Sequence, residues 1–175
     1  MLTEPLPTTL DVRKAAARGV TVSGLLKLSD MGRLREALAS DQGQVEAICA
    51  FAKDEERRLT VTVSVDARVE VVCQRCLESM AIEVHSEHAL GIVSDDEFAR
   101  QLPSHLEPWV VEEEQGDLWS LVEDELILSI PFASYHESEE CKQLLKDYSQ
   151  PAPVDGGEAV DNPFKVLEQL KPGNK

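Results

Sequence analysis

Residues 59–73 read LTVTVSVDARVEVVC, and this stretch decides the fold of the chain. Apolar side chains occupy every odd position from Leu59 to Cys73, whereas the even positions between them are polar apart from Val72. Side chains alternate between the two faces of a strand, so a period of two over this length predicts one long strand. We expect one face of that strand to be buried and the other to face water.

Weaker versions of the same alternation lie on both sides of this strand. Residues 45–51 and 80–92 each predict a further strand, and residues 18–28 predict an earlier one. The connections at 54–57 and 73–79 are short and polar, as expected between antiparallel neighbours. The pattern therefore predicts a twisted antiparallel sheet.

Two helices are expected to pack on this sheet. The first spans residues 31–39, behind a cap at Ser29 or Asp30. The second begins after Asp117, which acts as its cap, and ends at Pro131 at the latest. Its apolar face should lie on the sheet and carries Leu118, Leu121, Val122 and Leu126. The expected fold class is therefore α+β, with a few helices packed on one face of the sheet.

The chain divides into one domain and a tail. Residues 1–148 form a single α+β domain, and its first dozen residues are expected to be an irregular arm. Residues 149–161, SQPAPVDGGEAVD, are rich in proline, glycine and acidic residues and predict a flexible linker. Residues 162–175 complete the flexible acidic C-terminal tail with a short helical motif.

This C-terminal motif begins with Asn162 as a helix cap and Pro163 in the first turn. Phe164, Leu167 and Leu170 then form a short apolar stripe. The motif either folds back on its own domain or docks into a groove of a partner, with Phe164 as the anchor. In the second case Asn162, Pro163 and Phe164 are partner-binding residues.

The net charge of the chain is −16, and it is unevenly distributed. Residues 1–88 hold 11 basic and 14 acidic residues, a net −3, whereas residues 89–175 hold 6 basic and 19 acidic residues, a net −13. Such a field repels phosphate backbones and suits a basic protein partner, although the charge also serves simply to keep a protein soluble. Glu123, Asp124 and Glu125 of the second helix are accordingly either a solvated helix face or a docking surface for a basic partner.

Two small basic groups depart from this average. Arg13, Lys14 and Arg18 lie near the N-terminus, and Arg57 and Arg58 lie in a connection between strands. Direct binding of RNA would depend on such local patches. With two tryptophans, two tyrosines and four phenylalanines, the chain offers little aromatic surface for base stacking.

The start of the chain, MLTEPLP, lacks the basic residues and the apolar run of a signal peptide. No apolar stretch approaches the length that a bilayer requires, so no membrane partner is expected. Four cysteines in such a chain should be thiols or metal ligands rather than disulfides. The expected location is the cytoplasm.

The motif CQRC at residues 73–76 is the sharpest chemical signal. Two thiolates at this spacing bind one Zn²⁺ in zinc knuckles, and a closed tetrahedral site needs two more ligands. His136 and Cys141 follow the second helix and complete a candidate zinc site of Cys73, Cys76, His136 and Cys141. Plain reduced thiols and a redox pair are the alternatives, although a redox pair usually sits at a helix N-terminus rather than at a strand end.

The remaining candidates for chemistry have ordinary explanations. His85, His88 and His105 have no serine or cysteine nucleophile pattern around them, and His88 falls on the inward side of its strand. The glycine pair at 156–157 lacks the preceding strand and the following Lys-Thr of a phosphate-binding loop. Cys49 lies on the apolar face of its strand and should be a core residue. An enzyme is therefore not expected.

Several stretches together resemble the YceD family of large ribosomal RNA subunit accumulation proteins. They read LPTTLD at 6–11, VCQRCL at 72–77, LVEDELILSIP at 121–131 followed by His136 and Cys141, and NPFKVL at 162–167. The similarity runs in order over nearly the whole chain.

This resemblance implies a role in the synthesis, processing or stability of large-subunit (23S) ribosomal RNA, with no known catalytic activity. Genes of the family often neighbour one for a small basic large-subunit ribosomal protein. An acidic protein beside a basic one suggests an accessory factor that reaches the RNA indirectly, through a basic partner of complementary charge. The alternatives are a direct RNA chaperone that uses Arg13, Lys14 and Arg18, and a zinc- or thiol-dependent enzyme.

Overall fold

The structure is a computed structural model that describes residues 4–148, and the side chains of residues 4–143. The expected linker at 149–161 and the expected helical motif at 162–175 lie outside the described residues, and with them Asn162, Pro163 and Phe164.

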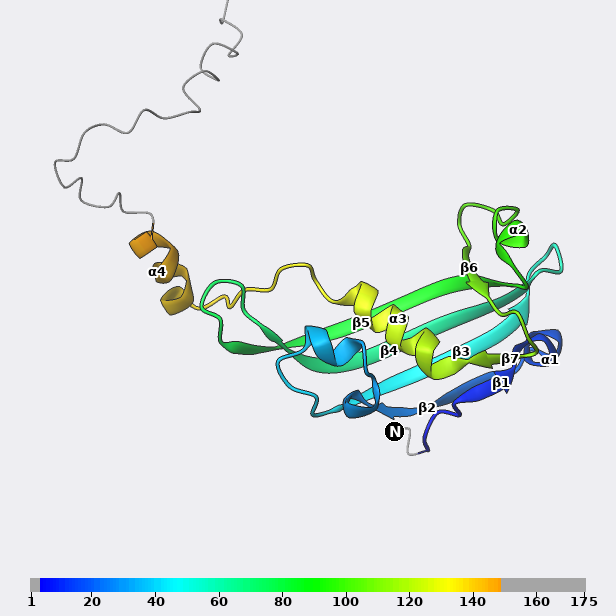
Figure 1. The fold of residues 1–175 in the computed structure, drawn as a ribbon, viewed down its shortest axis with the longest axis horizontal. Helices are drawn as coiled ribbons and strands as arrows, with labels where there is room; N and C mark the ends of the chain where they lie inside the picture. Colours follow the sequence, from blue (N-terminus) through cyan, green and yellow to red (C-terminus); the bar gives the residue numbers. More distant parts are fainter. Residues whose placement is uncertain (1–3, 149–175) are drawn as a thin grey trace, which may run out of the picture.

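Five strands form the main sheet in the spatial order β2-β3-β4-β5-β6 (Figure 1). Their bounds are Thr21–Lys27 for β2, Gln44–Lys53 for β3, Leu59–Val72 for β4, Ser79–Val93 for β5 and Glu107–Val110 for β6. The first four strands are antiparallel neighbours, whereas β6 runs parallel to β5. The α+β class and the three long central strands are thus confirmed. The parallel edge arises because the chain passes through the short helix α2 (Asp96–Ala99) before it returns to the sheet.

A second sheet joins the beginning of the chain to the start of the long helix. It pairs β1 (Thr9–Asp11) antiparallel with β7 (Gln115–Asp117). The next residue after β7 begins α3 (Leu118–Ser129), and its amide donates to the Thr8 carbonyl at 2.9 Å. Asp117 caps α3 by accepting hydrogen bonds from the amides of Trp119 and Ser120, as the sequence predicts.

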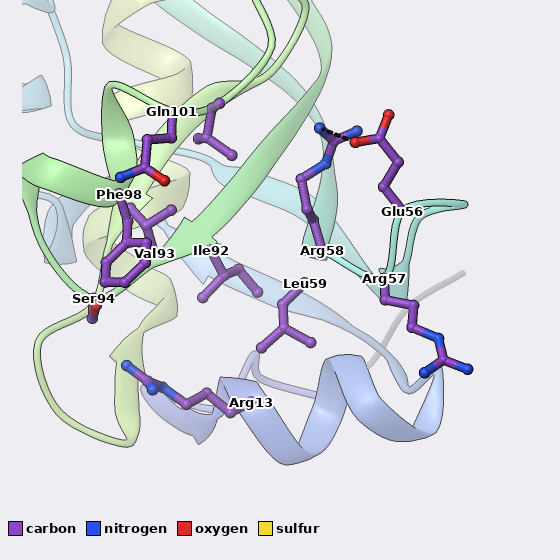
Figure 2. A pocket seen from close by; sticks show the side chains of 11 residues that line it. Arg13, Glu56, Arg57, Arg58, Leu59, Ile92, Val93, Ser94, Phe98 and Gln101 are labelled. Carbon is purple, nitrogen blue, oxygen red and sulfur yellow. Dashed lines mark ion pairs between the residues drawn. The ribbon is translucent and has the colours of Figure 1, made fainter.

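The hydrophobic core lies on one face of the main sheet. The inward residues of β4, such as Val61, Val63 and Val65, are completely buried, whereas their neighbours Thr62 and Ser64 are partly exposed. The same core cluster includes buried residues of α3 and of α1 (Val12–Arg18), so both helices cover the same face. Figure 1 shows α3 crossing in front of the strands, and Figure 2 shows Leu59 and Ile92 facing α1 at the end of the sheet.

The helix expected over residues 31–39 is not a regular α-helix, so that prediction was wrong. Two short 3₁₀ helices occupy this region, η1 (Leu28–Asp30) and η2 (Leu34–Ala37). The chain is then drawn back to the sheet, because the Ala39 amide donates to the Glu70 carbonyl at 2.7 Å. The apolar spacing within residues 31–39 is a local pattern, so it could not reveal that this tertiary contact limits the helix.

The N-terminal region also differs from the expected irregular arm. It contains β1 and α1, and the strand expected from residue 18 begins only at Thr21. Asp11 caps α1 by accepting a hydrogen bond from the Lys14 amide, and Gly19 ends it in the left-handed conformation at φ 66°. These two residues, with the alanines between them, were the sequence signals for α1.

The last described element is α4 (Glu139–Tyr148), which follows an extended segment after α3. Among the described residues, no helix combines the length and the apolar character needed to cross a membrane.

Candidate metal centre

The turn between β4 and β5 presents two cysteine side chains. Cys73 ends the buried face of β4, and its amide donates to the Glu78 carbonyl at 2.9 Å. The Leu77 amide donates back to the Cys73 carbonyl at 3.0 Å, and Leu77 adopts a left-handed φ of 62°. This tight turn brings Cys76 back beside Cys73.

The segment that follows α3 docks against this turn. The Gln74 amide donates to the Ser134 carbonyl at 2.9 Å, and the Arg75 guanidinium lies 5.0 Å from the centre of the Tyr135 ring. These contacts place His136 next to the turn. Cys141 lies in the first turn of α4 and is buried.

The four predicted ligands converge on one point. The Sγ atoms of Cys73 and Cys141 are 3.6 Å apart, and Cys76 Sγ lies 3.2 Å from His136 Nδ1. All four ligand atoms lie within 4.8 Å of one another. In a tetrahedral zinc site with Zn–S bonds of about 2.3 Å, neighbouring sulfurs are roughly 3.8 Å apart, so the separations fit one Zn²⁺.

The electrostatics of Cys73 favour the thiolate. Burial acts to raise the pKa of this thiol, but the backbone amides of Cys76, His136 and Arg75 point at its sulfur and lower the pKa to about 5. For Cys76 an amide hydrogen bond from Glu78 acts to lower the pKa, yet burial and the neighbouring sulfurs of Cys73 and Cys141 raise it overall. A thiolate is the form that binds metal, so amides aimed at Cys73 prepare one ligand in advance.

Cys49 provides a contrast with these four residues. It is completely buried in the core on β3, as predicted, and burial raises the pKa of its thiol to about 12. A thiol in this environment is an apolar packing group rather than a nucleophile or a ligand.

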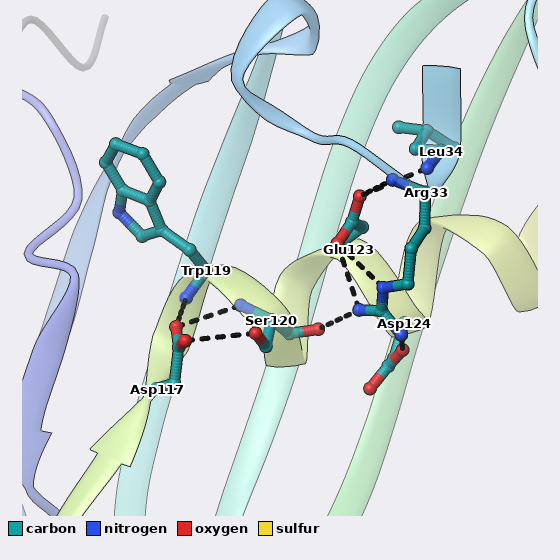
Figure 3. Close-up of polar contacts among 7 residues, drawn as sticks. All are labelled: Arg33, Leu34, Asp117, Trp119, Ser120, Glu123 and Asp124. Atoms are coloured by element: carbon teal, nitrogen blue, oxygen red, sulfur yellow. Dashed lines mark hydrogen bonds and ion pairs between the residues drawn. The ribbon is translucent and has the colours of Figure 1, made fainter. Parts of the chain in front are cut away.

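The three carboxylates of α3 do not form the solvated acidic face that the sequence suggested. Glu123 is only 8% exposed and accepts hydrogen bonds from the amides of Arg33 at 2.7 Å and Leu34 at 3.1 Å (Figure 3). The Arg33 guanidinium pairs with Glu123 at 2.9 Å and with Asp124 at 2.6 Å. Asp124 keeps about half of its side chain exposed (54%), so it is the one member of the three that faces outward.

Glu125 is buried on the sheet side of α3, at 2% exposure. It accepts hydrogen bonds from Ser86 Oγ at 3.3 Å and lies 2.7 Å from His88 Nδ1. Ser86 and His88 share the side of β5 that carries the buried Val84 and Leu90, as predicted for His88, although the His88 side chain is still 53% exposed. Polar residues at inward positions opposite a helix were the signal for this contact, which the sequence interpretation missed.

The three carboxylates therefore diverge, and the expectation of one solvated acidic face is corrected for Glu123 and Glu125. His85 and His105 are also exposed, and His85 pairs with Asp66 at 2.7 Å. Within residues 4–143, these side chains add no further ligand to the Cys–His cluster.

Comparison with known proteins places this architecture in a family. Residues 61–171 match the family described as large ribosomal RNA subunit accumulation protein YceD. The chain is also similar to the large ribosomal RNA subunit accumulation protein YceD of Haemophilus influenzae, at 29% identity over 167 residues, which cover 95% of this chain and 96% of the relative. No solved structure matches the chain. The family is thus named for the accumulation of large-subunit ribosomal RNA. The chain, with its Cys–His cluster inside the matched region, therefore belongs to the YceD family of large ribosomal RNA subunit accumulation proteins.

Proposed function

We propose that this protein is a non-enzymatic accessory factor for the accumulation of large-subunit (23S) ribosomal RNA in the cytoplasm. This proposal rests on the match of residues 61–171 to the YceD family. It rests also on the similarity of nearly the full chain to a curated protein that bears the family's name. The protein acts on synthesis, processing or stability of the RNA through a protein partner rather than by its own chemistry.

The distribution of charge supports a basic partner. Most of the acidic excess lies in residues 89–175, which contain 19 acidic and 6 basic residues. In the first half, several cations are already neutralised within the fold: Lys14 pairs with Asp11 at 2.7 Å, and Arg58 pairs with Asp54 at 2.6 Å. A surface of this kind attracts a cationic protein, such as a basic large-subunit ribosomal protein, more readily than it grips a phosphate backbone.

The Cys–His cluster supports a structural zinc. We propose that Cys73, Cys76, His136 and Cys141 hold one Zn²⁺ with four protein ligands, which leaves no open position for a substrate. Such a site fastens the β4–β5 turn to the segment after α3. Its contribution is to folding, not to catalysis.

The partner-binding surface that follows from this proposal includes Asp124 and the C-terminal motif. Asp124 is the exposed carboxylate of α3. For Asn162, Pro163 and Phe164 the argument is the sequence pattern alone, a capped helix start with an apolar anchor.

The test is an affinity purification from growing cells, with the full chain and a truncation before Asn162 compared by mass spectrometry. We expect a basic large-subunit ribosomal protein to co-purify with the full chain and to be depleted from the truncation. Depletion of the protein from cells should lower the ratio of large-subunit to small-subunit ribosomal RNA. An unchanged ratio would contradict the accessory role.

The charge mechanism makes a separate prediction with purified components. Affinity for the basic partner should fall steeply between low and physiological salt, because screened surface charges contribute less. Binding that is indifferent to salt would rule out this mechanism. Tight binding of bare precursor RNA, lost in the Arg13→Ala, Lys14→Ala, Arg18→Ala triple variant, would instead favour a direct RNA chaperone.

A further inference from the structure

A cavity of about 480 Å³ lies at the end of the sheet opposite the Cys–His cluster. It opens between α1, the β3–β4 turn and the loop that carries α2 (Figure 2). Residues from four separate parts of the chain line it, and they include Arg13, Arg57, Leu59, Ile92, Phe98 and Gln101. The fold thus brings together two basic groups, at 13 and at 57–58, that lie far apart in the sequence.

The charge of this cavity is opposite to that of the chain. Arg13, Arg57 and Arg58 line it with a single acid, Glu56, so the lining carries a net +2 on a protein of net charge −16. Arg58 is already committed to Asp54 and Glu56. Arg13 and Arg57 make no ion pair among the described residues, and they are the cations that remain available to a ligand.

Arg13 is positioned by the fold. Its guanidinium donates one hydrogen bond to the Val111 carbonyl at 3.3 Å, which leaves its other N–H groups for a second acceptor. In Figure 2 the guanidinium reaches toward Ser94 and Phe98, across the mouth of the cavity. Arg57 stands on the opposite rim, in the turn held by Asp54, with a left-handed φ of 64°, and its side chain points away from Arg13 (Figure 2).

The floor of the cavity is apolar and includes an exposed aromatic ring. Leu59 and Ile92 lie at its centre, and Val93 and Leu102 extend the apolar surface. Phe98 is 54% exposed, so about half of this side chain is open to a ligand. The Gln101 side chain lies above the ring and offers both a donor and an acceptor.

We propose that this cavity binds a nucleoside 5′-monophosphate, either free or as the phosphorylated 5′ end of an RNA strand. Arg13 holds the phosphate, because a planar guanidinium fork matches two phosphate oxygens. Phe98 and the apolar floor receive the planar base, and Gln101 contacts its edge. The size of the cavity is that of a small-ligand site rather than of a peptide groove.

This site does not depend on the partner or the zinc proposed above. The acidic surroundings explain why one phosphate, rather than a long backbone, is the suitable ligand. Each additional phosphate would enter the negative field of the chain, whereas a single terminal phosphate meets Arg13. An acidic peptide is the competing occupant, and it offers a planar group for the exposed ring only if it contains an aromatic residue.

The experiment measures binding of AMP, GMP, CMP and UMP to the full-length protein by isothermal titration calorimetry. Chemical-shift changes of residues 13, 98 and 101 in NMR spectra locate the site. A second arm compares a short oligoribonucleotide that bears a 5′-phosphate with the same strand that bears a 5′-hydroxyl. We expect a Kd between about 10 µM and 1 mM for at least one ligand. If only free nucleotides bind, the ligand is a free nucleoside monophosphate. If the phosphorylated strand binds as well, the ligand can also be the 5′ end of an RNA.

Two matched variants test the assignment. Arg13→Gln should weaken binding about tenfold or more, because it removes a charged hydrogen-bond donor from the phosphate. Arg18→Gln removes the same charge from the same helix outside the cavity and should leave the Kd within about twofold. Both residues are exposed, and unchanged thermal unfolding will show that the fold is preserved.

Three results would overturn the proposal. They are no binding of any of these ligands at millimolar concentration, equal weakening by Arg13→Gln and Arg18→Gln, and preference for an acidic aromatic peptide over every nucleotide. Equal weakening would mean that the affinity depends on the net charge of the protein and not on the position of Arg13 in the cavity.

Discussion

At the scale of the residue, one carboxylate joins α3 to the start of η2. Burial acts to raise the pKa of Glu123, but the Leu34 amide and the Arg33 side chain and amide outweigh it, so the pKa lies below its ordinary value. The ionised carboxylate therefore stabilises the folded state.

We expect Glu123→Gln to lower the free energy of unfolding at pH 7 by about 1–3 kcal/mol, because charge-assisted hydrogen bonds are replaced by neutral ones. The stabilisation is complete above the unfolded carboxyl pKa, near 4.3, and is lost as the pH falls through the lower folded pKa. Urea denaturation at a series of pH values should show the difference between wild type and variant shrinking below about pH 4.3.

Asp124→Asn is the matched control for that measurement. The substitution removes one negative charge, as Glu123→Gln does. Asp124 contacts the same Arg33, at 2.6 Å, but the Asp124 side chain is 54% exposed. Exposed pairs contribute little, so we expect a change of about 1 kcal/mol or less. Equal losses in both variants would show that burial of Glu123 is not what makes it stabilising.

At the scale of the element, the N-terminal segment closes one edge of the main sheet. The Leu6 amide donates to the Leu25 carbonyl at 3.2 Å, and the Leu25 amide donates to the Glu4 carbonyl at 2.9 Å. This close approach depends on Gly24, where a Cβ would lie 2.7 Å from the carbonyl carbon of Pro5 and closer still to the backbone of Leu6. Backbone atoms cannot move aside as a side chain can.

We therefore expect Gly24→Ala to destabilise the protein by about 2 kcal/mol or more, because the segment must leave the edge of β2. Thermal unfolding will measure the loss, and hydrogen exchange at the Leu6 and Leu25 amides will locate it. The control is Gly32→Ala, where a Cβ would meet nothing within 4 Å. That variant should be neutral or slightly stabilising. A neutral Gly24→Ala would contradict the packing described here.

At the scale of the whole molecule, the Cys–His cluster ties together segments that are distant in the chain. Cys73 and Cys76 follow β4, whereas His136 and Cys141 follow α3. A metal held by all four would cross-link the sheet to the last described helix.

We expect the purified protein to contain about one zinc per chain. Chelation, or Cys73→Ser, should remove the metal and lower the Tm by several degrees or more, because metal binding contributes directly to folding. Cys49→Ala is the control: it alters a buried cysteine outside the cluster and should keep the zinc, at a cost of about 1 kcal/mol. Absence of metal from freshly purified protein, with a Tm unaffected by Cys73→Ser, would refute the zinc proposal.

Local patterns predicted much of this fold. The alternation from Leu59 to Cys73 determined β4, and its continuation on both sides determined β3 and β5. Asp117 marked the start of α3 because an N-cap is a local interaction within one turn. Asp11 and Gly19 marked α1 in the same way, although the sequence interpretation did not use them.

By itself, then, the sequence determined β3, β4, β5 and the cap of α3, because these depend on neighbours in the chain, and it identified the four side chains of the Cys–His cluster as a candidate metal site. Only the tertiary structure decided that Glu123 meets Arg33, that Glu125 meets His88, and that Arg13 and Arg57 share one cavity. The physical reason is that burial of a charge and convergence of side chains depend on how elements pack. A periodicity records which way a residue faces but not which distant residue lies opposite to it.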